Sequence, residues 1–347
     1  MNQLKTAILG LDEQGQLLLE AAAKLDYFQV QAVADRDAEL AKKTAGKYGC
    51  LPYDDYRQLI MQNQFDCLLV AAGLYSCDEY VRTAMKKKCN IFKLSPPAKN
   101  FTQAGELVRL AEEENIKFAV ANPSRFAQGF LALKKFLQEN RIEQIFLLTA
   151  VYNGANEHTP LWQADPKLAG GGVLLYNCYE IIDQIVWNFG VPQQVYSLNT
   201  NQATDKQQRL YLTEDTAVVT MKFTDTFFGT LTAGRNLGPK QDFLKIYGKD
   251  KALTVTGNLF IISDHLGRTI EEFEYRDDRI CCMNRVLENF ALSILSPDKN
   301  RLCSSAEENL KDMAVIESAY LSARTGMPEE PPRILQMPSS SAVTAAI

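Results

Sequence analysis

The chain has 347 residues, with 37 Lys and Arg against 42 Asp and Glu, a formal net charge of −5 and a pI near 5.4. This length predicts two domains, and the acidic balance excludes the basic surface of a nucleic-acid-binding protein. No apolar run reaches the roughly 18 residues of a membrane span. Eight cysteines without a CxxC pair and only two histidines argue against a zinc site. We therefore expect a cytoplasmic protein with free thiols, no metal, and no membrane or nucleic-acid partner.

The first segment, residues 5–37, has the pattern of a dinucleotide-binding unit. An apolar strand is followed by a glycine turn, an amphipathic helix and a second strand that ends at Asp35. In this context GxGxxG binds a pyrophosphate, and an acid about 20 residues on binds the ribose hydroxyls. Gly10, Gly15 and Asp35 match that design. Arg36 would instead suit a 2′-phosphate, so the sequence leaves NAD and NADP open.

The middle glycine of this fingerprint is replaced. The sequence GLDEQG puts Asp12 where a glycine lets the backbone approach the pyrophosphate. A side chain adds bulk there, and a carboxylate adds like-charge repulsion. We expect dinucleotide affinity to be weakened, or the dinucleotide to be lost while the fold is kept.

Alternating strands and helices continue to residue 121. Residues 65–73 and 90–94 are short apolar strands, and amphipathic helices precede and follow each of them. This alternation predicts a doubly wound, Rossmann-type parallel sheet over residues 1–121.

The pattern changes from residue 122. One helix and one long strand are followed by a glycine-rich helix start and several alternating or β-branched runs between residues 194 and 264. They predict a C-terminal α+β domain, residues 122–333, with an open, mostly antiparallel sheet and helices on one face. The chain after Gly326 is Pro- and Ser-rich and aperiodic, and residues 334–347 are expected to form a tail. The open face of this sheet is rich in aromatic residues, namely Phe223, Phe227, Phe228 and Tyr247. An apolar face of this kind must be covered.

Six stretches in the same order resemble the Gfo/Idh/MocA family of oxidoreductases. They are residues 32–49, 65–73, 122–126, 162–190, 244–253 and 315–326. The resemblance implies hydride transfer between a nicotinamide and the hydroxyl group of a sugar or cyclitol. It also implies that a second copy covers the C-terminal sheet, giving a homodimer or homotetramer.

The resemblance also locates the catalytic positions, and each carries a different residue here. Ser95 stands at the family's lysine and is followed by Pro96, with a cis peptide bond as one expectation. Tyr176 and Glu180 stand at the aspartate and histidine of the active-site helix. Ala72 occupies the threonine of the family's Thr-Pro after the fourth strand.

Two functions follow from these replacements. In the first, the usual Lys/Asp/His chemistry is lost and the protein retains binding of a nucleotide or a sugar-like ligand. In the second, the protein is an active NAD(P)-dependent dehydrogenase or reductase in which Tyr176 and Glu180 serve instead, because residues four apart share a helix face.

The sequence leaves two interpretations open for some other residues. Lys93, two residues before Ser95, either points to the same side and reaches the site, or faces solvent or an acid. Arg125 either lies near the site or forms an ordinary ion pair. The glycines at 170–172 either allow close packing or let the chain pass near a ligand.

Overall fold

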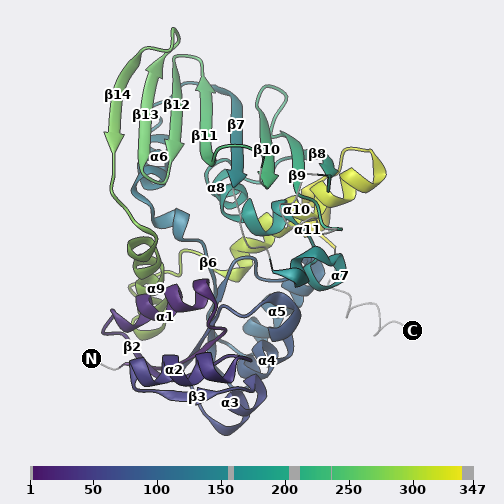
Figure 1. The fold of residues 1–347 in the computed structure, drawn as a ribbon. Coiled ribbons are helices and arrows are strands. Elements are labelled where there is room, and N and C mark those ends of the chain that lie inside the picture. The colour runs from purple at the N-terminus through teal and green to yellow at the C-terminus, as the bar shows by residue number, and fades with distance from the viewer. Residues whose placement is uncertain (1–2, 155–159, 203–211, 236, 338–347) are drawn as a thin grey trace. The chain divides into compact units, whose positions relative to one another are not determined.

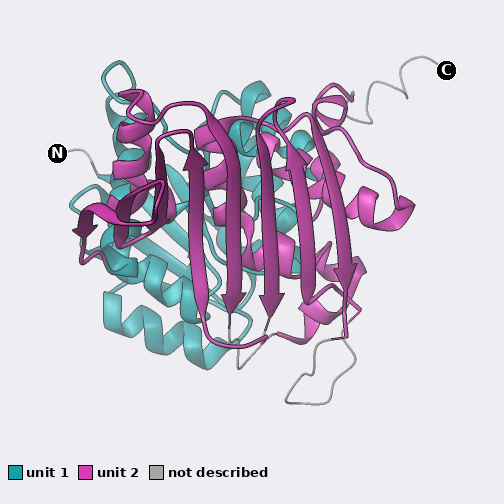
Figure 2. Ribbon diagram, turned by 90° about the horizontal axis from the view of Figure 1, so that it is seen from above, with its two compact units in different colours: residues 1–98, 103–123, 278–309 teal, residues 99–102, 124–277, 310–347 magenta. Residues whose placement is uncertain are grey.

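The computed structural model describes residues 3–154, 160–202, 212–235 and 237–337, which form two compact units. Unit 1 comprises residues 1–98, 103–123 and 278–309, and unit 2 comprises residues 99–102, 124–277 and 310–347 (Figure 2). This division differs from the continuous one expected from the sequence, because residues 278–309 return to unit 1.

Unit 1 is a six-stranded parallel sheet of order β3-β2-β1-β4-β5-β6 with helices on both faces (Figure 1). Its elements are β1 (Leu4–Leu9), α1 (Glu13–Ala23), β2 (Phe28–Ala34), α2 (Ala38–Tyr48), β3 (Leu51–Tyr53), α3 (Tyr56–Gln62), β4 (Cys67–Val70), α4 (Leu74–Lys86), β5 (Asn90–Leu94), α5 (Phe101–Glu113), β6 (Phe118–Ala121) and α9 (Arg279–Leu295). The predicted doubly wound fold is confirmed.

Two neighbouring residues of β5 show why helices cover both faces of this sheet. Phe92 packs on Phe290 of α9, with ring centroids 5.4 Å apart. Lys93 points the other way and contacts Cys77 of α4. Successive side chains of a strand alternate between faces, so a strand that is apolar throughout needs cover on each side.

Unit 2 is built on an eight-stranded sheet of order β14-β13-β12-β11-β7-β10-β9-β8, in which only β7 and β10 pair in parallel. Its elements are η1 (Pro123–Phe126), α6 (Gln128–Gln138), β7 (Ile145–Gly154), η2 (Leu161–Ala164), α7 (Pro166–Ala169), η3 (Val173–Asn177), α8 (Tyr179–Phe189), β8 (Gln194–Thr200), β9 (Thr216–Lys222), β10 (Phe228–Arg235), β11 (Gln241–Gly248), β12 (Lys251–Thr256), β13 (Leu259–Asp264), β14 (Thr269–Glu274), α10 (Ala306–Thr325) and α11 (Pro331–Leu335). The expected α+β domain with a mostly antiparallel sheet is confirmed.

One face of this sheet is covered by helices and the other is open. Along β9 and β10 buried residues such as Val219 and Leu231 alternate with exposed ones such as Val218 and Phe228. Phe223 differs from the expectation because it is buried and stacks on Phe227, with centroids 4.5 Å apart. It therefore belongs to the covered side.

The start of the predicted tail is also structured. Ile334 lies in α11 and is buried, and Glu329 just before this helix forms a β-bridge with Val195. Residues 338–347 lie outside the described part of the chain.

Candidate functional site

The glycines of the first turn pack strand, helix and neighbouring loop together. Gly10 follows β1 with a φ of +86°, and a Cβ added there would lie 2.5 Å from the backbone nitrogen of Ala72. A Cβ at Gly15 would lie 2.1 Å from the carbonyl oxygen of Gly10. Both overlaps involve backbone atoms, so these two glycines are required for close packing of the turn. The backbone of Ala72 lies against this turn.

Asp12 begins helix α1 as its N-cap. One carboxylate oxygen accepts a hydrogen bond from the backbone nitrogen of Gly15, 3.0 Å away. A helix N-terminus favours negative charge. Because Asp12 already supplies that charge, a dinucleotide phosphate arriving there meets a carboxylate.

Asp35 and Arg36 lie at the end of β2, next to this turn. The two carboxylate oxygens of Asp35 accept hydrogen bonds from the backbone nitrogens of Leu11 (2.7 Å) and Asp37 (2.9 Å). Arg36 is exposed, and its guanidinium carbon lies 5.5 Å from the ring centroid of Tyr75. Asp35 therefore fixes the turn, and each of its carboxylate oxygens keeps a further lone pair that can accept another hydrogen bond.

The segment after β5 carries a cis peptide bond between Ser95 and Pro96. Lys93 is only 3% exposed, so its alternative of facing solvent is wrong. Its Nζ lies 3.7 Å from Sγ of Cys77, in the first turn of α4. The fold joins these two residues across 16 positions of the chain.

In unit 2, Glu180 is held by Ser124. The backbone nitrogen of Ser124 donates to Oε2 of Glu180 over 3.0 Å, and the serine hydroxyl donates to the same oxygen. Burial raises the pKa of Glu180 above its ordinary value, the carboxylates of Asp242 and Asp183 add to this, and the two bonds from Ser124 oppose it. The carboxyl group of Glu180 therefore holds its proton to higher pH than an exposed glutamate does.

One turn further along α8, Asp183 forms a buried ion pair with Arg125. The arginine Nε and Nη2 lie 2.6–3.1 Å from the two carboxylate oxygens. The guanidinium carbon also lies 5.4 Å from the ring centroid of Trp187. Of the two interpretations of Arg125, the ion pair holds, and it fixes the segment before α6 onto α8.

Tyr176 lies in the π-helical turn η3 before α8. Its hydroxyl donates to the carbonyl oxygen of Ala169 over 2.6 Å, and its ring packs edge-on against Trp162 at 5.5 Å. In this arrangement the phenol proton is directed at the backbone. Tyr176 and Glu180 are near one another along the chain, and the hydroxyl of Tyr176 binds the backbone.

Packing explains the three glycines at 170–172. An added Cβ would meet Lys99 O at 2.3 Å for Gly170, the Tyr320 hydroxyl at 2.1 Å for Gly171, and Glu214 O at 1.9 Å for Gly172. The Glu214 carboxylate accepts hydrogen bonds from the Leu174 backbone nitrogen and the Tyr320 hydroxyl, at 3.0 and 2.8 Å, and burial raises its pKa.

Sequence reasoning missed Glu214 and Tyr320. Glu214 stands in an ordinary turn sequence, and Tyr320 is one of several aromatic residues in a long helix. Nothing in either local pattern signals that the two side chains meet beneath the active-site helix.

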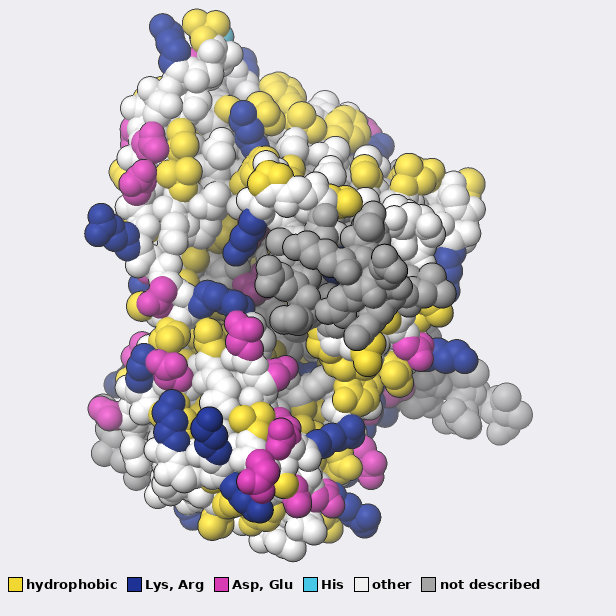
Figure 3. Space-filling view, in the orientation of Figure 1, with side chains coloured by type: hydrophobic (Ala, Val, Ile, Leu, Met, Phe, Trp, Pro, Cys, Tyr) yellow, Lys and Arg dark blue, Asp and Glu magenta, His cyan; other side chains and the backbone are white. Residues whose placement is uncertain are grey.

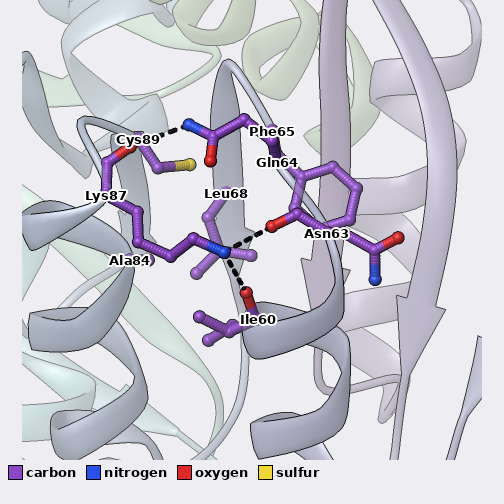
Figure 4. A pocket seen from close by; sticks show the side chains of 8 residues that line it. All are labelled: Ile60, Asn63, Gln64, Phe65, Leu68, Ala84, Lys87 and Cys89. Atoms are coloured by element: carbon purple, nitrogen blue, oxygen red, sulfur yellow. Dashed lines mark hydrogen bonds between the residues drawn. The ribbon is translucent and has the colours of Figure 1, made fainter.

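A small pocket in unit 1 lies between α3 and the end of α4 (Figure 4). Lys87 Nζ donates to the carbonyl oxygens of Ile60 and Asn63, at 2.7 and 2.6 Å, and Gln64 donates to the Lys87 carbonyl. Lys87 thus satisfies the C-terminal carbonyls of α3. The polar groups of this pocket are engaged in structural bonds.

The distribution of charged side chains on the surface does not favour one function over another. On the face drawn in Figure 3, acidic and basic side chains are interspersed. Within the described ranges, no three His, Cys, Asp or Glu side chains gather as a metal ion would require. Nor does any helix of the described chain combine the length and apolar character of a membrane span.

Comparison with known sequences decides the family. Residues 4–122 match the family model described as "Oxidoreductase family, NAD-binding Rossmann fold", and residues 130–254 match the "GFO/IDH/MocA C-terminal domain". The chain belongs to the Gfo/Idh/MocA family. As a Gfo/Idh/MocA protein, it carries in unit 1 the domain that binds NAD in this family.

Two curated relatives are similar to this Gfo/Idh/MocA chain. The scyllo-inositol 2-dehydrogenase (NADP(+)) IolU of Bacillus subtilis is 26% identical over 55% of the chain. The 2,7-anhydro-N-acetylneuraminate hydratase of Mediterraneibacter gnavus is 24% identical over 64% of the chain. In each case the match spans 60% of the relative's length.

A solved structure supports the fold over almost the whole chain. An oxidoreductase from Agrobacterium radiobacter, crystallised with NAD+, L-tartaric acid and magnesium, superposes with a TM-score of 0.81. The match covers 96% of this chain and 100% of the other at 18% identity. At that identity the likeness shows the fold alone.

Proposed function

We propose that this protein is an NAD(P)-dependent oxidoreductase that acts on a hydroxyl group of a sugar- or cyclitol-like compound. The observation that carries the proposal is Glu180, a carboxyl group with a raised pKa that Ser124 holds by two donors. Oxidation of an alcohol requires a base for the hydroxyl proton, and Glu180 fills that role. The oxidoreductases and the inositol dehydrogenase among the relatives support the substrate class.

The residues of the first turn fit a dinucleotide, with reduced affinity. Gly10 and Gly15 keep the close packing of strand and helix, and Asp35 offers acceptors to the ribose. Asp12 opposes the pyrophosphate at the N-terminus of α1. Gly10, Gly15 and Asp35 would hold NAD(P)+, which would supply the acceptor for the hydride of the alcohol. Glu180 takes the hydroxyl proton, and Ser124 keeps the carboxylate oriented for it.

A second candidate function is a ligand-binding relative without hydride chemistry. Two observations favour it: Ser95 stands at the lysine position of the family, and Asp12 caps the helix that faces the phosphates. A serine supplies no cation for a developing oxyanion. In this case the protein retains nucleotide or sugar-like ligands and Glu180 has no reaction to serve.

Two measurements separate the candidates. Thermal unfolding with NAD+, NADH, NADP+ and NADPH tests the dinucleotide, because a ligand at one hundred times its Kd adds about 2.7 kcal/mol of stability. Absorbance of reduced nicotinamide with a panel of cyclitols and sugars tests turnover. Turnover that Glu180→Gln reduces by about 100-fold or more supports the enzyme, with the exposed Glu139→Gln as the matched control. Stabilisation by a nucleotide without any turnover supports the second candidate, and no stabilisation by any of the four defeats the first.

A further inference from the structure

A buried amine and a buried thiol meet in unit 1. Lys93 of β5 is 3% exposed and Cys77 of α4 is 1% exposed, and Nζ of the lysine lies 3.7 Å from Sγ of the cysteine. In the part of the chain that the structure describes, the lysine amine makes no other hydrogen bond and no ion pair. Lysine is almost never fully buried unless it is paired, and here its partner is a thiol.

Strand and helix hold the two groups in place. β5 lies between β4 and β6, where Lys93 pairs with Val70 on one side and Val120 on the other. Cys77 lies in the first turn of α4, which begins after the N-cap Gly73. The nitrogen and the sulfur are therefore fixed at contact distance, and groups held in this way react far faster than free groups in solution.

Two other buried thiols of unit 1 contact oxygen atoms instead. Sγ of Cys67 lies 3.1 Å from the hydroxyl oxygen of Thr6, and Sγ of Cys89 donates to the carbonyl oxygen of Asn90 over 3.7 Å. Burial raises the pKa of Cys67 to about 12 and that of Cys89 well above its ordinary value, which favours the unreactive thiol. A lysine, in contrast, is one of the groups that stabilise a neighbouring thiolate, and the thiolate is the form that peroxides oxidise.

The pair lies directly beneath the surface. Leu94 and Ser95 follow Lys93 along the chain, and Ser76 precedes Cys77; each of these three neighbours is half-buried. Local opening of such side chains is enough to admit a molecule as small as hydrogen peroxide.

We propose that Cys77 and Lys93 form a peroxide-dependent modification site, at which the two side chains become joined by a sulfur–nitrogen bond. In the first step the Cys77 thiolate attacks hydrogen peroxide, so that an S–O bond forms and the O–O bond breaks. The released hydroxide takes a proton from the Lys93 ammonium and becomes water. The sulfur is thereby oxidised to a sulfenic acid, the peroxide is reduced, and Lys93 is left as a neutral amine.

The second step needs no further oxidant. The Lys93 nitrogen attacks the Cys77 sulfur, the S–N bond forms and the S–O bond breaks. The hydroxide leaves with an amine proton as a second molecule of water. The product is a sulfenamide, which thiols reduce back to the free cysteine and lysine.

The bond ties the start of α4 to β5. The N-cap Gly73 follows Ala72, whose backbone nitrogen lies 2.5 Å from a Cβ added at Gly10. The crosslink therefore fixes the segment against which the first glycine turn packs. The inference goes beyond the proposed function, because the reaction requires a peroxide and neither a dinucleotide nor a sugar.

Peptide mapping of the full chain tests the site. The reduced protein is treated with hydrogen peroxide, its remaining thiols are alkylated, and it is digested with trypsin without reductant. Trypsin cuts only after a free lysine, so cleavage after Lys93 should be lost. Residues 58–82 and 89–99 should appear as one joined species, lighter than the two peptides by the mass of H₂, which dithiothreitol separates. A disulfide between Cys67 and Cys89 differs, because it joins residues 58–82 to residues 89–93.

Variants of each partner complete the test, with circular dichroism to confirm that they fold. Cys77→Ser removes the sulfur, and Lys93→Met removes the amine while keeping a long apolar side chain. Each should abolish the joined species, and whichever variant folds decides the question. Cys89→Ala, at another buried thiol of unit 1, is the matched control and should retain the joined species.

Three results overturn the site. The first is a wild-type protein that yields no joined species at a peroxide concentration that fully oxidises the exposed Cys281. The second is a joined species that persists in Cys77→Ser or Lys93→Met. The third is a Cys77 that is converted to its sulfinic acid while trypsin still cuts after Lys93.

Discussion

The first turn contains two glycines that the fold requires and a middle position at which a glycine would serve the ligand. Gly10 and Gly15 each lie against backbone atoms that a side chain would strike, so any sequence with this turn retains them. The middle position serves the approach of a pyrophosphate, and there the chain has Asp12. The fingerprint of this chain therefore keeps the two glycines that packing requires and replaces the one at the position that serves the ligand.

Asp12→Ser should tighten dinucleotide binding without weakening the helix. Serine is as good an N-cap as aspartate, and it removes the charge that repels the phosphates. Relief of about 1 kcal/mol corresponds to roughly a fivefold lower Kd, measured by titration of NADH fluorescence. Asp55→Ser makes the same change at the N-cap of α3 and serves as the control. Equal effects of the two variants on Kd would contradict our account of the turn.

Ser124→Ala tests the tuning of Glu180 through pH. The serine hydroxyl bonds to the carboxylate and lowers the pKa of Glu180, so its loss raises that pKa further. A base works when deprotonated, so activity rises as pH passes the pKa. The acidic limb of kcat/KM should therefore lie above the ordinary glutamate value of 4.5 in the wild type. In Ser124→Ala the limb should move to higher pH. If the acidic limb of the kcat/KM profile stays at the same pH in Ser124→Ala, or moves to lower pH, a group other than Glu180 determines that limb.

At the scale of elements, local patterns were sufficient for unit 1. Asp37 and Gly49 cap α2 at its two ends, and apolar runs between turn residues mark β4 and β5. Such signals lie within a few residues of the element they define. The doubly wound sheet was predictable for that reason.

The candidate site was predictable only where its contacts are local or follow a family motif. Asp12, Asp35 and Glu180 were predicted in this way, and their functional roles stay predictions. The contact between Lys93 and Cys77 and that between Glu214 and Tyr320, 106 positions apart, depend on how whole elements pack. The pairing of Tyr152 with Asp242 depends on strand register, which alternating hydrophobicity does not specify for β7.

Gly172→Ala should destabilise unit 2 through the packing of η3 on Glu214. The added Cβ would lie 1.9 Å from the Glu214 carbonyl oxygen, and overpacking of this kind costs about 1–3 kcal/mol. The midpoint of urea unfolding measures the loss. Gly105→Ala is the contrasting control, because nothing lies within 4 Å of its added Cβ and alanine favours the α5 helix by about 1 kcal/mol. If both variants gain stability, the glycines at 170–172 serve something other than packing.

At the scale of the whole molecule, the open face of the unit 2 sheet is the largest unexplained surface. Leu198 (60% exposed), Val218 (43%) and Phe228 (46%) lie on neighbouring strands of this face. Threonines such as Thr220 and Thr230 lie between them, and the same face carries Lys222, which pairs with Phe228, and Lys245 of β11. Monomeric proteins rarely expose a contiguous apolar area of this kind. We infer that a second copy of the chain covers it, sheet against sheet.

Val218→Glu should therefore separate the copies. Val218 pairs with Leu198 on one side and Thr232 on the other, so a carboxylate there is buried without a partner when two such faces meet, at a cost of several kcal/mol. The wild type should elute as a dimer or tetramer in size-exclusion chromatography with light scattering, and the variant as a monomer with an unchanged circular dichroism spectrum. Met61→Glu places the same charge at an exposed residue of unit 1 and should leave the assembly intact. A wild type that is monomeric at micromolar concentration would mean that the face is open in solution, and a Val218→Glu variant that stays oligomeric would place the interface elsewhere on the chain.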